Sequence, residues 1–301
     1  MVIEGNLMLR PGLMKQARIL ITGGGTGLGR IMAEGCAALG ATVYICGRRG
    51  GLLEAAAAEI NGAGIVGEVK PVACDIREAT AIDAMLAAIW QDGPLTGLVN
   101  NAAANFIARS ETISPNGFDA IANTVARGAF LLTTKCGARW IEQGVKAAVV
   151  SVLTTWVLNG GPFGTPAAMA KAGVWAMTQS LAVEWGRHGI NLNAICPGAF
   201  PPTEGMAARL MTAEQGITQE NANPLQRYGS PEELANLVTF LLAPGSSFIS
   251  GQLIAIDGAG YQFNGGNFSN LTAWSSADWE ETRAKIRAVD AKDRELRTAT
   301  F

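Results

Sequence analysis

The chain has 301 residues, 49% of them hydrophobic and 16% charged, which provides enough apolar surface for a packed core and too little charge for a disordered protein. The formal net charge is −2 and no run of Lys and Arg is dense enough to follow a phosphate backbone, so we expect no nucleic-acid partner. The apolar runs are shorter than the ~20 residues of a membrane helix, and residues 1–16 lack the apolar centre of a signal peptide. We therefore expect a cytoplasmic protein that does not bind membranes.

Metal-binding and thiol chemistry find little support in the composition. His188 is the single histidine, which excludes a multi-histidine metal site and leaves no obvious Ser-His-Asp triad. The cysteines are odd in number, scattered and without a C-x-x-C pair, so we expect buried free thiols in a reducing compartment and no metal. They are Cys36, Cys46, Cys74, Cys136 and Cys196.

Short, continuously apolar runs alternate with longer Ala-rich stretches from Arg18 onward. Continuous apolar character predicts strands covered on both faces, and stretches such as Ile31 to Leu39 have helical length and composition. Repeated strand–helix units predict an α/β fold with a doubly wound parallel sheet. The predicted strands are Arg18–Thr22, Thr42–Cys46, Glu68–Ala73, Gly97–Asn100, Ala147–Val152, Asn191–Cys196 and Leu253–Ile256.

No linker or internal repeat divides this pattern, so we predict one domain with a core of about residues 17–260. A C-terminal extension covers about residues 261–301. It passes through a Gly/Asn-rich stretch, Gly258 to Asn270, into a predicted helix from about Ala277 to Arg297 with Ser276 as its N-cap.

A glycine-rich run follows the first predicted strand directly and precedes the first predicted helix. Its sequence is Thr22-Gly23-Gly24-Gly25-Thr26-Gly27-Leu28-Gly29. Glycines at this place permit a tight turn, a close approach of the backbone to a pyrophosphate, and close packing of helix on strand. The run therefore predicts a dinucleotide-phosphate cradle, with a merely flexible turn as the alternative.

Two arginines, Arg48 and Arg49, follow the second predicted strand, where an NAD-binding fold would place an acidic residue for the ribose. A guanidinium offers a fixed fork of donors to phosphate oxygens, so the pair favours NADP(H) over NAD(H). The alternative is that both arginines simply face solvent in a loop. Further strand ends supply Asp75-Ile76, a candidate adenine contact, and Asn100-Asn101-Ala102-Ala103, a shelf of small residues.

The ordered motifs T-G-x-x-x-G-x-G, N-N-A-A, Lys171 and Pro197-Gly198 resemble those of the short-chain dehydrogenase/reductase superfamily, which has a Rossmann-type fold. Within it, the chain is most similar to 2,4-dienoyl-CoA reductases. That likeness lies in the segments 21–29, 100–107, 170–174, 197–205, 224–227 and 267–279, and it spans roughly residues 10–290. The resemblance implies an NADPH-dependent reductase of fatty acid metabolism acting on an enoyl- or 2,4-dienoyl-CoA thioester. It also implies a homotetramer or dimer formed through helices near 116–143 and 164–189.

The resemblance also implies site residues. The residues that would bind the cofactor lie in the glycine-rich run and at the ends of the later strands. They are Thr22, Gly23, Gly25, Thr26, Gly27, Leu28, Arg48, Arg49, Asp75, Ile76, Asn101, Ala102, Lys171, Pro197, Gly198 and Thr203. Most members of the superfamily use an Asn-Ser-Tyr-Lys set, in which the Tyr lies four residues before the Lys. Here the Lys is Lys171, Thr154 stands at the Ser position and Arg127 at the Asn position, but Ala167 replaces the Tyr. Some dienoyl-CoA reductases use another Tyr after the fifth strand, and Trp156 stands there.

Ala167 has no proton to give, which argues against ordinary carbonyl reduction because that reaction places a negative charge on an oxygen. Hydride addition to an activated C=C bond instead gives an enolate, which fixed donors can stabilise. We expect Lys171 to bind the nicotinamide ribose, and Thr154, together with Thr155, Trp156 or Arg127, to donate to the substrate oxygen. Phe200, Met206 and Met211 would line an apolar lid.

Two other hypotheses stay open. In the first, the chain is a carbonyl reductase or hydroxy-substrate dehydrogenase that recruits another proton donor. Tyr261 is the best placed tyrosine for this role, since Tyr44 is expected in the core and Tyr228 in a loop. Alternatively, it is an inactive NADP-binding protein.

Overall fold

The computed structural model describes residues 7–105, 108–201, 223–265, 274–278, 280–282 and 284. The chain divides into two compact units, residues 1–261 and residues 262–301. All strands that the structure describes belong to the first unit.

A seven-stranded parallel sheet, with strand order β3-β2-β1-β4-β5-β6-β7, forms the centre of the first unit. This confirms the predicted doubly wound sheet, because the order reverses direction at β1 and β4. β2 and β6 are slightly longer than predicted and the other five strands have the predicted bounds. The strands are β1 (Arg18–Thr22), β2 (Thr42–Gly47), β3 (Glu68–Ala73), β4 (Gly97–Asn100), β5 (Ala147–Val152), β6 (Ile190–Pro197) and β7 (Leu253–Ile256).

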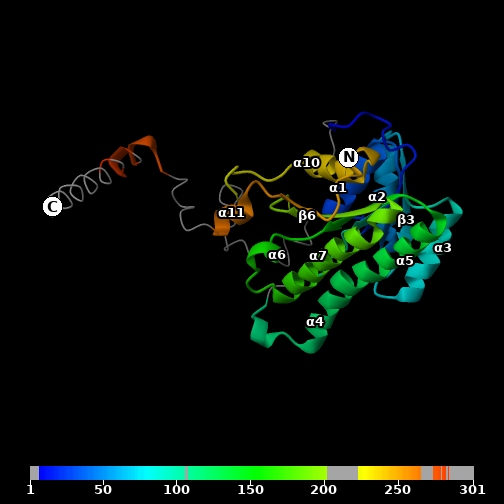
Figure 1. The fold of residues 1–301 in the computed structure, drawn as a ribbon, viewed down its shortest axis with the longest axis horizontal. Helices are drawn as coiled ribbons and strands as arrows, with labels where there is room; N and C mark the ends of the chain where they lie inside the picture. Colours follow the sequence, from blue (N-terminus) through cyan, green and yellow to red (C-terminus); the bar gives the residue numbers. More distant parts are fainter. Residues whose placement is uncertain are drawn as a thin grey trace. The chain divides into compact units, whose positions relative to one another are not determined.

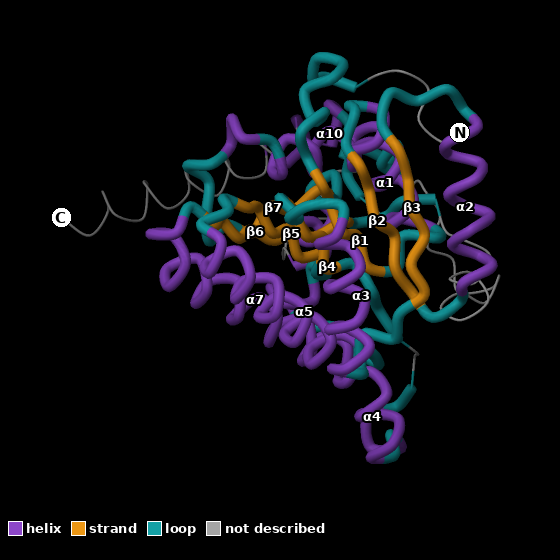
Figure 2. The backbone as a smooth tube through the Cα atoms, turned by 90° about the vertical axis from the view of Figure 1, so that its right-hand side faces the viewer, coloured by secondary structure: helices purple, strands orange, loops and turns teal. Residues whose placement is uncertain are grey.

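Helices cover both faces of the sheet, as Figure 2 shows. One buried cluster joins the sheet to α1 (Gly27–Ala38), α2 (Gly50–Gly62) and α10 (Pro231–Leu242). A second cluster, on the opposite face, joins it to α3 (Ala79–Gln91), α5 (Gly128–Gln143) and α7 (Thr165–Trp185). The remaining α-helices of this unit are α4 (Pro115–Ala122) and α6 (Trp156–Asn159), and α11 (Gly260–Gly265) runs across the boundary between the units.

The edge strand β3 departs from the prediction that every strand is covered on both faces. Val69 is buried, whereas Glu68, Pro71 and Ala73 are exposed. An edge strand has one free row of backbone groups, which explains why Pro71, a residue without an N–H, is tolerated in the middle of β3.

The N-terminus of the described helical residues near 276–284 lies one residue earlier than predicted. The Ser275 hydroxyl accepts a hydrogen bond from the Asp278 N–H at 3.3 Å, and the Asp278 carboxylate accepts one from the Ser275 N–H at 2.7 Å. This reciprocal pair makes Ser275, rather than Ser276, the N-cap. Residues 285–297 of the predicted helix lie outside the described residues. No helix among the described residues is long and apolar enough to cross a membrane.

Candidate active site

The glycine-rich turn is joined to the shelf after β4 through Thr22, the last residue of β1. The Thr22 hydroxyl accepts hydrogen bonds from the backbone N–H groups of Asn101 (2.9 Å) and Ala102 (2.8 Å). In return, the Asn101 side-chain amide donates to the Thr22 carbonyl at 2.8 Å. Two predicted cofactor-binding segments, whose bonded residues are 79 and 80 positions apart in the chain, are therefore held together at the carboxyl ends of two neighbouring strands.

Glycine is required within the turn for two separate reasons. Gly23 (φ +67°) and Gly27 (φ +54°) have left-handed backbone conformations that L side chains rarely adopt. A Cβ on Gly29 would overlap the Gly23 carbonyl oxygen and would lie 2.6 Å from the Asn101 side-chain nitrogen. The first turn of α1 therefore packs directly on the end of β1, which a larger residue would prevent.

Helix α1 begins at this turn without any acidic or capping side chain. Its N-cap, Thr26, makes no side-chain cap hydrogen bond, and the first helical turn contains no Asp or Glu. The N–H groups of the first turn and the helix dipole are thus left to attract an anion. With the glycines and the clamped shelf, this arrangement fits the pyrophosphate of a dinucleotide.

Arg48 and Arg49 lie exposed between the end of β2 and the start of α2. Neither forms an ion pair with any described residue. The first turn of α2 also lacks acidic residues, and its N-cap Arg49 makes no side-chain cap bond. Two free guanidiniums beside an uncapped helix N-terminus fit a phosphate group.

Asp75 and Ile76, the predicted adenine contacts, are in different surroundings. The Arg77 guanidinium donates to both oxygens of Asp75, at 3.0 and 2.6 Å, and this bonding, aided by the charge of Arg48, holds the pKa of Asp75 below its usual range. Ile76 is buried in the core beside Gly128, the first residue of α5. The Asp75 carboxylate therefore stays charged, while the Ile76 side chain belongs to the core. The sequence reasoning missed Arg77, although its place two residues after Asp75 was visible.

Lys171 projects from α7 to the end of β5. It is buried, and its Nζ donates a hydrogen bond to the Val152 carbonyl. Burial lowers its pKa to about 8, and the nearby Cys196 opposes this shift only weakly. Among the described residues no carboxylate pairs with Lys171. The other two ammonium protons are available to oxygen atoms of a ligand.

Two further donors lie just beyond β5. Thr154 is half-buried, and its hydroxyl has no partner among the described residues. Trp156 begins α6, and its Cε3, Cζ3 and Cη2 edge faces the turn before α7. The indole N–H lies on the other edge of the ring and makes no hydrogen bond within the described part of the chain. Lys171, Thr154 and Trp156 thus bring three donors to one strand end.

The wall beside these donors is apolar. Ala167 and Ala170 of α7 form a buried cluster with Ile121 and Val125, and Trp156 packs against this cluster. Val125 lies in a π-helical turn, Asn123–Arg127, that joins α4 to α5. The residue that packs with Ala167 is therefore Val125, not Arg127.

Arg127 is exposed and its guanidinium donates to the Arg77 carbonyl, two residues after Asp75. It lines a polar surface pocket of about 380 Å³ together with Arg77, Glu78 and Asn123. The structure brings Lys171, Thr154 and Trp156 together and does not bring Arg127 to them. The π-helical turn, which rotates successive side chains by less than an α-helix does, was not visible in the sequence.

Asn105 was not predicted as a site residue, although it belongs to the run after β4 on which the resemblance rests. Its Oδ1 atom is buried without a hydrogen-bond partner among the described residues. A buried acceptor without a donor is costly, and a hydroxyl or amide of a bound ligand would satisfy it.

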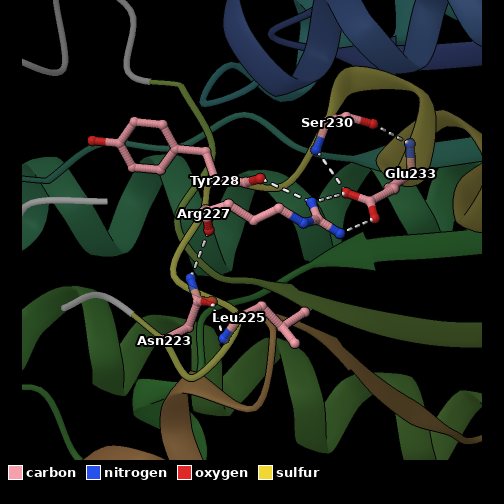
Figure 3. Close-up of polar contacts among 6 residues, drawn as sticks. All are labelled: Asn223, Leu225, Arg227, Tyr228, Ser230 and Glu233. Atoms are coloured by element: carbon pink, nitrogen blue, oxygen red, sulfur yellow. Dashed lines mark hydrogen bonds and ion pairs between the residues drawn. The ribbon is translucent and has the colours of Figure 1, made fainter. Parts of the chain in front are cut away.

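Among the described residues, none of the three tyrosines forms a hydrogen bond with Lys171. Tyr44 is in the core strand β2, as expected, and donates to Asp92 at 2.7 Å. Tyr228 points away from the Arg227–Glu233 ion pair in the turn before α10 (Figure 3). Tyr261 is the second residue of α11, and its backbone N–H donates to the Asp257 carboxylate at 2.8 Å.

Two contacts hold the described residues that follow β6. The Gly198 N–H donates to the Ile256 carbonyl at 3.0 Å, and a Cβ there would lie 2.5 Å from the Asp257 Cβ, so Gly198 allows β6 and β7 to end in contact. Phe200 is buried and packs on Gly229. Thr203, Met206 and Met211 lie outside the described residues.

Comparison with known proteins matches residues 23–262 to the family described as Enoyl-(Acyl carrier protein) reductase. The chain belongs to the short-chain dehydrogenase/reductase family. It is 38% identical to a probable 2,4-dienoyl-CoA reductase of Caenorhabditis elegans, over 97% of this chain and 96% of that protein. This confirms the likeness to dienoyl-CoA reductases, and the chain is thus an oxidoreductase of this family.

Solved structures of other members share the fold but are named for other reactions. A citronellol catabolism dehydrogenase of Pseudomonas aeruginosa PAO1 superimposes with a TM-score of 0.75 at 36% identity, over 85% of this chain and all of that one. A variant actinorhodin polyketide ketoreductase, solved with NADPH, gives a TM-score of 0.74 at 27% identity, over 81% of this chain and 96% of that one. The substrate of this family member must therefore be argued from its own site.

Proposed function

We propose that this protein is an NADPH-dependent reductase of an activated C=C bond, and that its substrate is an enoyl- or 2,4-dienoyl-CoA thioester. The observation that carries the proposal is the contrast at the end of β5. Lys171 and the Thr154 hydroxyl lie at this strand end, and the buried cluster next to them contains Ala167, which cannot donate a proton, packed with Val125 and Trp156. Such a site can hold a negatively charged oxygen but has no tuned acid for a ketone.

The proposed cofactor is NADP(H), which supplies a hydride when it is bound. The turn 22–29 and the start of α1 hold its pyrophosphate, and Arg48 and Arg49 hold the additional ribose phosphate. Lys171 donates to the nicotinamide ribose, with Pro197 and Gly198 on the nicotinamide side and Thr203 as a further proposed contact. The relative solved with NADPH supports this assignment by family likeness.

Thr154 and Trp156 are the proposed donors to the thioester oxygen. Neither donor atom has a hydrogen-bond partner among the described residues, and fixed donors stabilise an enolate oxygen more in a dry site than in water. The proton that completes the reduction goes to carbon from water or a weak acid, since an indole N–H does not ionise at neutral pH. Arg127 is proposed to bind a phosphate group of CoA at the polar pocket, as it does not reach the other donors.

Incubation with NADPH and a 2,4-dienoyl-CoA, followed at the cofactor's absorbance band, tests the reaction. We expect oxidation of NADPH with a dienoyl or enoyl thioester and none with a panel of ketones and secondary alcohols. Reduction of ketones instead would favour a carbonyl reductase with another proton donor, such as Tyr261. Tight NADPH binding without turnover would favour a binding protein and refute the proposed reaction.

Arg48→Asp tests the cofactor assignment separately. The new carboxylate repels the additional phosphate and accepts a ribose hydroxyl instead, so we expect the preference for NADPH over NADH to fall at least about 10-fold. Calorimetric titration with each nucleotide measures this ratio. Arg10→Asp, the same change of charge at an exposed arginine that precedes β1, is the control, and an unchanged ratio in Arg48→Asp would refute the assignment.

We also propose a homo-oligomer formed through α5 and α7, which lie side by side in Figure 1. Their outer faces leave Phe130, Met169 and Val183 between 51% and 85% exposed, an area of apolar surface that a second copy would cover. Light scattering should show a tetramer or dimer that Val183→Glu dissociates and that Val66→Glu, an exposed valine elsewhere, leaves intact. A monomeric wild type would refute this part.

A further inference from the structure

The indole ring of Trp156 is fixed on one side by two glycines in the turn between α6 and α7. A Cβ on Gly161 would lie 2.5 Å from the indole Cδ2, and a Cβ on Gly164 would lie 2.8 Å from Cζ3. Real Cβ atoms do not come this close, so both positions must be glycine while the ring stays where it is. The indole ring therefore packs closely against this turn and cannot move toward it.

The indole also packs against the buried cluster of Ile121, Val125, Ala167 and Ala170. Ala167 is 6% exposed, and it follows Gly164 by three residues, which places both on adjoining parts of the first turn of α7. The side chain at 167 can grow in only a few directions, because the cluster closes around it. We therefore expect a longer side chain at position 167 to meet the residues of this cluster and the indole packed against it.

We propose that Trp156 determines the substrate class of this site by filling the space beside Ala167. With the indole in place, no proton-donating side chain longer than Ala fits at position 167, and the surface next to Lys171 stays apolar. Such a surface accepts the flat, apolar part of a conjugated acyl group and rejects hydroxylated substrates such as polyols. The assignment of the acyl substrate rests on the proposed function, whereas the steric claim does not.

A double-mutant cycle in thermal stability tests the steric claim without substrate or cofactor. Ala167→Tyr should overfill the cluster and lower the unfolding midpoint by about 2–8 °C. In Trp156→Ala the space is open, so adding Ala167→Tyr should cost little or nothing further. Equal losses from Ala167→Tyr in the presence and absence of the indole would overturn the proposal, because they would show that the two positions do not share space.

Two controls keep the cycle interpretable. Ala58→Tyr makes the same change at an exposed position of α2 and should leave the midpoint within about 2 °C of the wild type. If Ala167→Tyr does not fold, the smaller Ala167→Leu replaces it, and the expected coupling to Trp156→Ala has the same sign. A wild-type midpoint for Ala167→Leu would also overturn the proposal.

Substrate selection tests the consequence for chemistry. In Trp156→Ala/Ala167→Tyr a phenol lies near the Lys171 ammonium, which lowers a phenol pKa, so NADPH-dependent ketone reduction should rise at least about 10-fold over the wild type. Ala167→Tyr alone should not show this gain. Equal ketone reduction by the single and double variants would refute control by the indole. If the wild type reduces no thioester, the proposed function fails while the stability cycle still decides the steric claim.

Discussion

The ends of β1 and β2 and the end of β5 lie on the same edge of one sheet, yet they differ in what holds them. At β1, the glycines let α1 pack on the end of the strand, and the Thr22 hydroxyl binds the backbone of the segment after β4. The charged side chains nearby, Arg48 and Arg49, form no ion pair with a described residue. At β5, side chains define the site, and Lys171 and its neighbouring donors face an apolar wall. A cradle built from backbone depends on which positions are glycine, whereas a wall built from side chains can change its chemistry by single substitutions.

The largest effect is expected at Lys171. Lys171→Ala removes the buried ammonium from the end of β5 and should lower kcat at least about 100-fold, since charge stabilisation in such a site contributes several kcal/mol. Steady-state kinetics with a 2,4-dienoyl-CoA and circular dichroism for the fold measure this. Lys135→Ala, which removes a partly buried lysine paired with Asp83, should retain activity. Full activity in Lys171→Ala would remove the residue from the mechanism.

Gly29→Ala should break the backbone cradle and leave the β5 wall unchanged. The added methyl group overlaps the Gly23 carbonyl, so α1 must shift, at a cost of about 1–3 kcal/mol in the free energy of unfolding. NADPH affinity should fall at least about 10-fold, because the N–H groups of α1 move with the helix. Chemical denaturation and calorimetry test both. Gly62→Ala, at a helical glycine with open space around it, should leave both quantities nearly unchanged.

The pKa of Lys171 gives a pH-dependent prediction for the unliganded protein. The folded pKa is about 8 and the ordinary value is 10.5, so between these pH values the unfolded chain binds more protons than the folded one. The free energy of unfolding of the wild type therefore rises with pH across this window, and the penalty for burying the charge is complete below about pH 8.

Lys171→Met lacks this penalty. Its stability relative to the wild type should be greatest near pH 7 and should fall by up to about 3 kcal/mol as the pH approaches 10. The lost hydrogen bond to the Val152 carbonyl adds a term that does not vary with pH. Denaturation at a series of pH values measures the difference. A difference that stays constant from pH 7 to 10 would contradict the lowered pKa.

The smallest effect is expected in the turn that leads into α10 (Figure 3). Unlike the other two regions, this turn is held by exposed charged side chains. Arg227 and the Ser230 N–H bond to Glu233 and lower its pKa to about 2. This contributes stability above pH ~4.5 that is lost as the pH falls toward 2. Both side chains are about half exposed, so Glu233→Gln should cost at most about 1 kcal/mol at pH 7.

Denaturation at pH 7 and pH 3 measures that contribution. The difference between Glu233→Gln and the wild type should shrink at the lower pH, and Glu54→Gln on the exposed face of α2 should show no such change. A Glu233→Gln variant more stable than the wild type at pH 7 would contradict the stabilising role of the Glu233 charge.

The sequence by itself determined the order and type of the core elements, because apolar runs, Ala-rich stretches and the glycine turn are local patterns that each specify one conformation. It also determined the position of Lys171 and the lack of an acid at Ala167. Only the tertiary structure decided which side chains meet there. Val125 rather than Arg127 packs with Ala167 because a π-helical turn shifts the side chains before α5, and Asn105 is left as a buried acceptor. These outcomes depend on packing between elements far apart in the chain, for which no local pattern gives a signal.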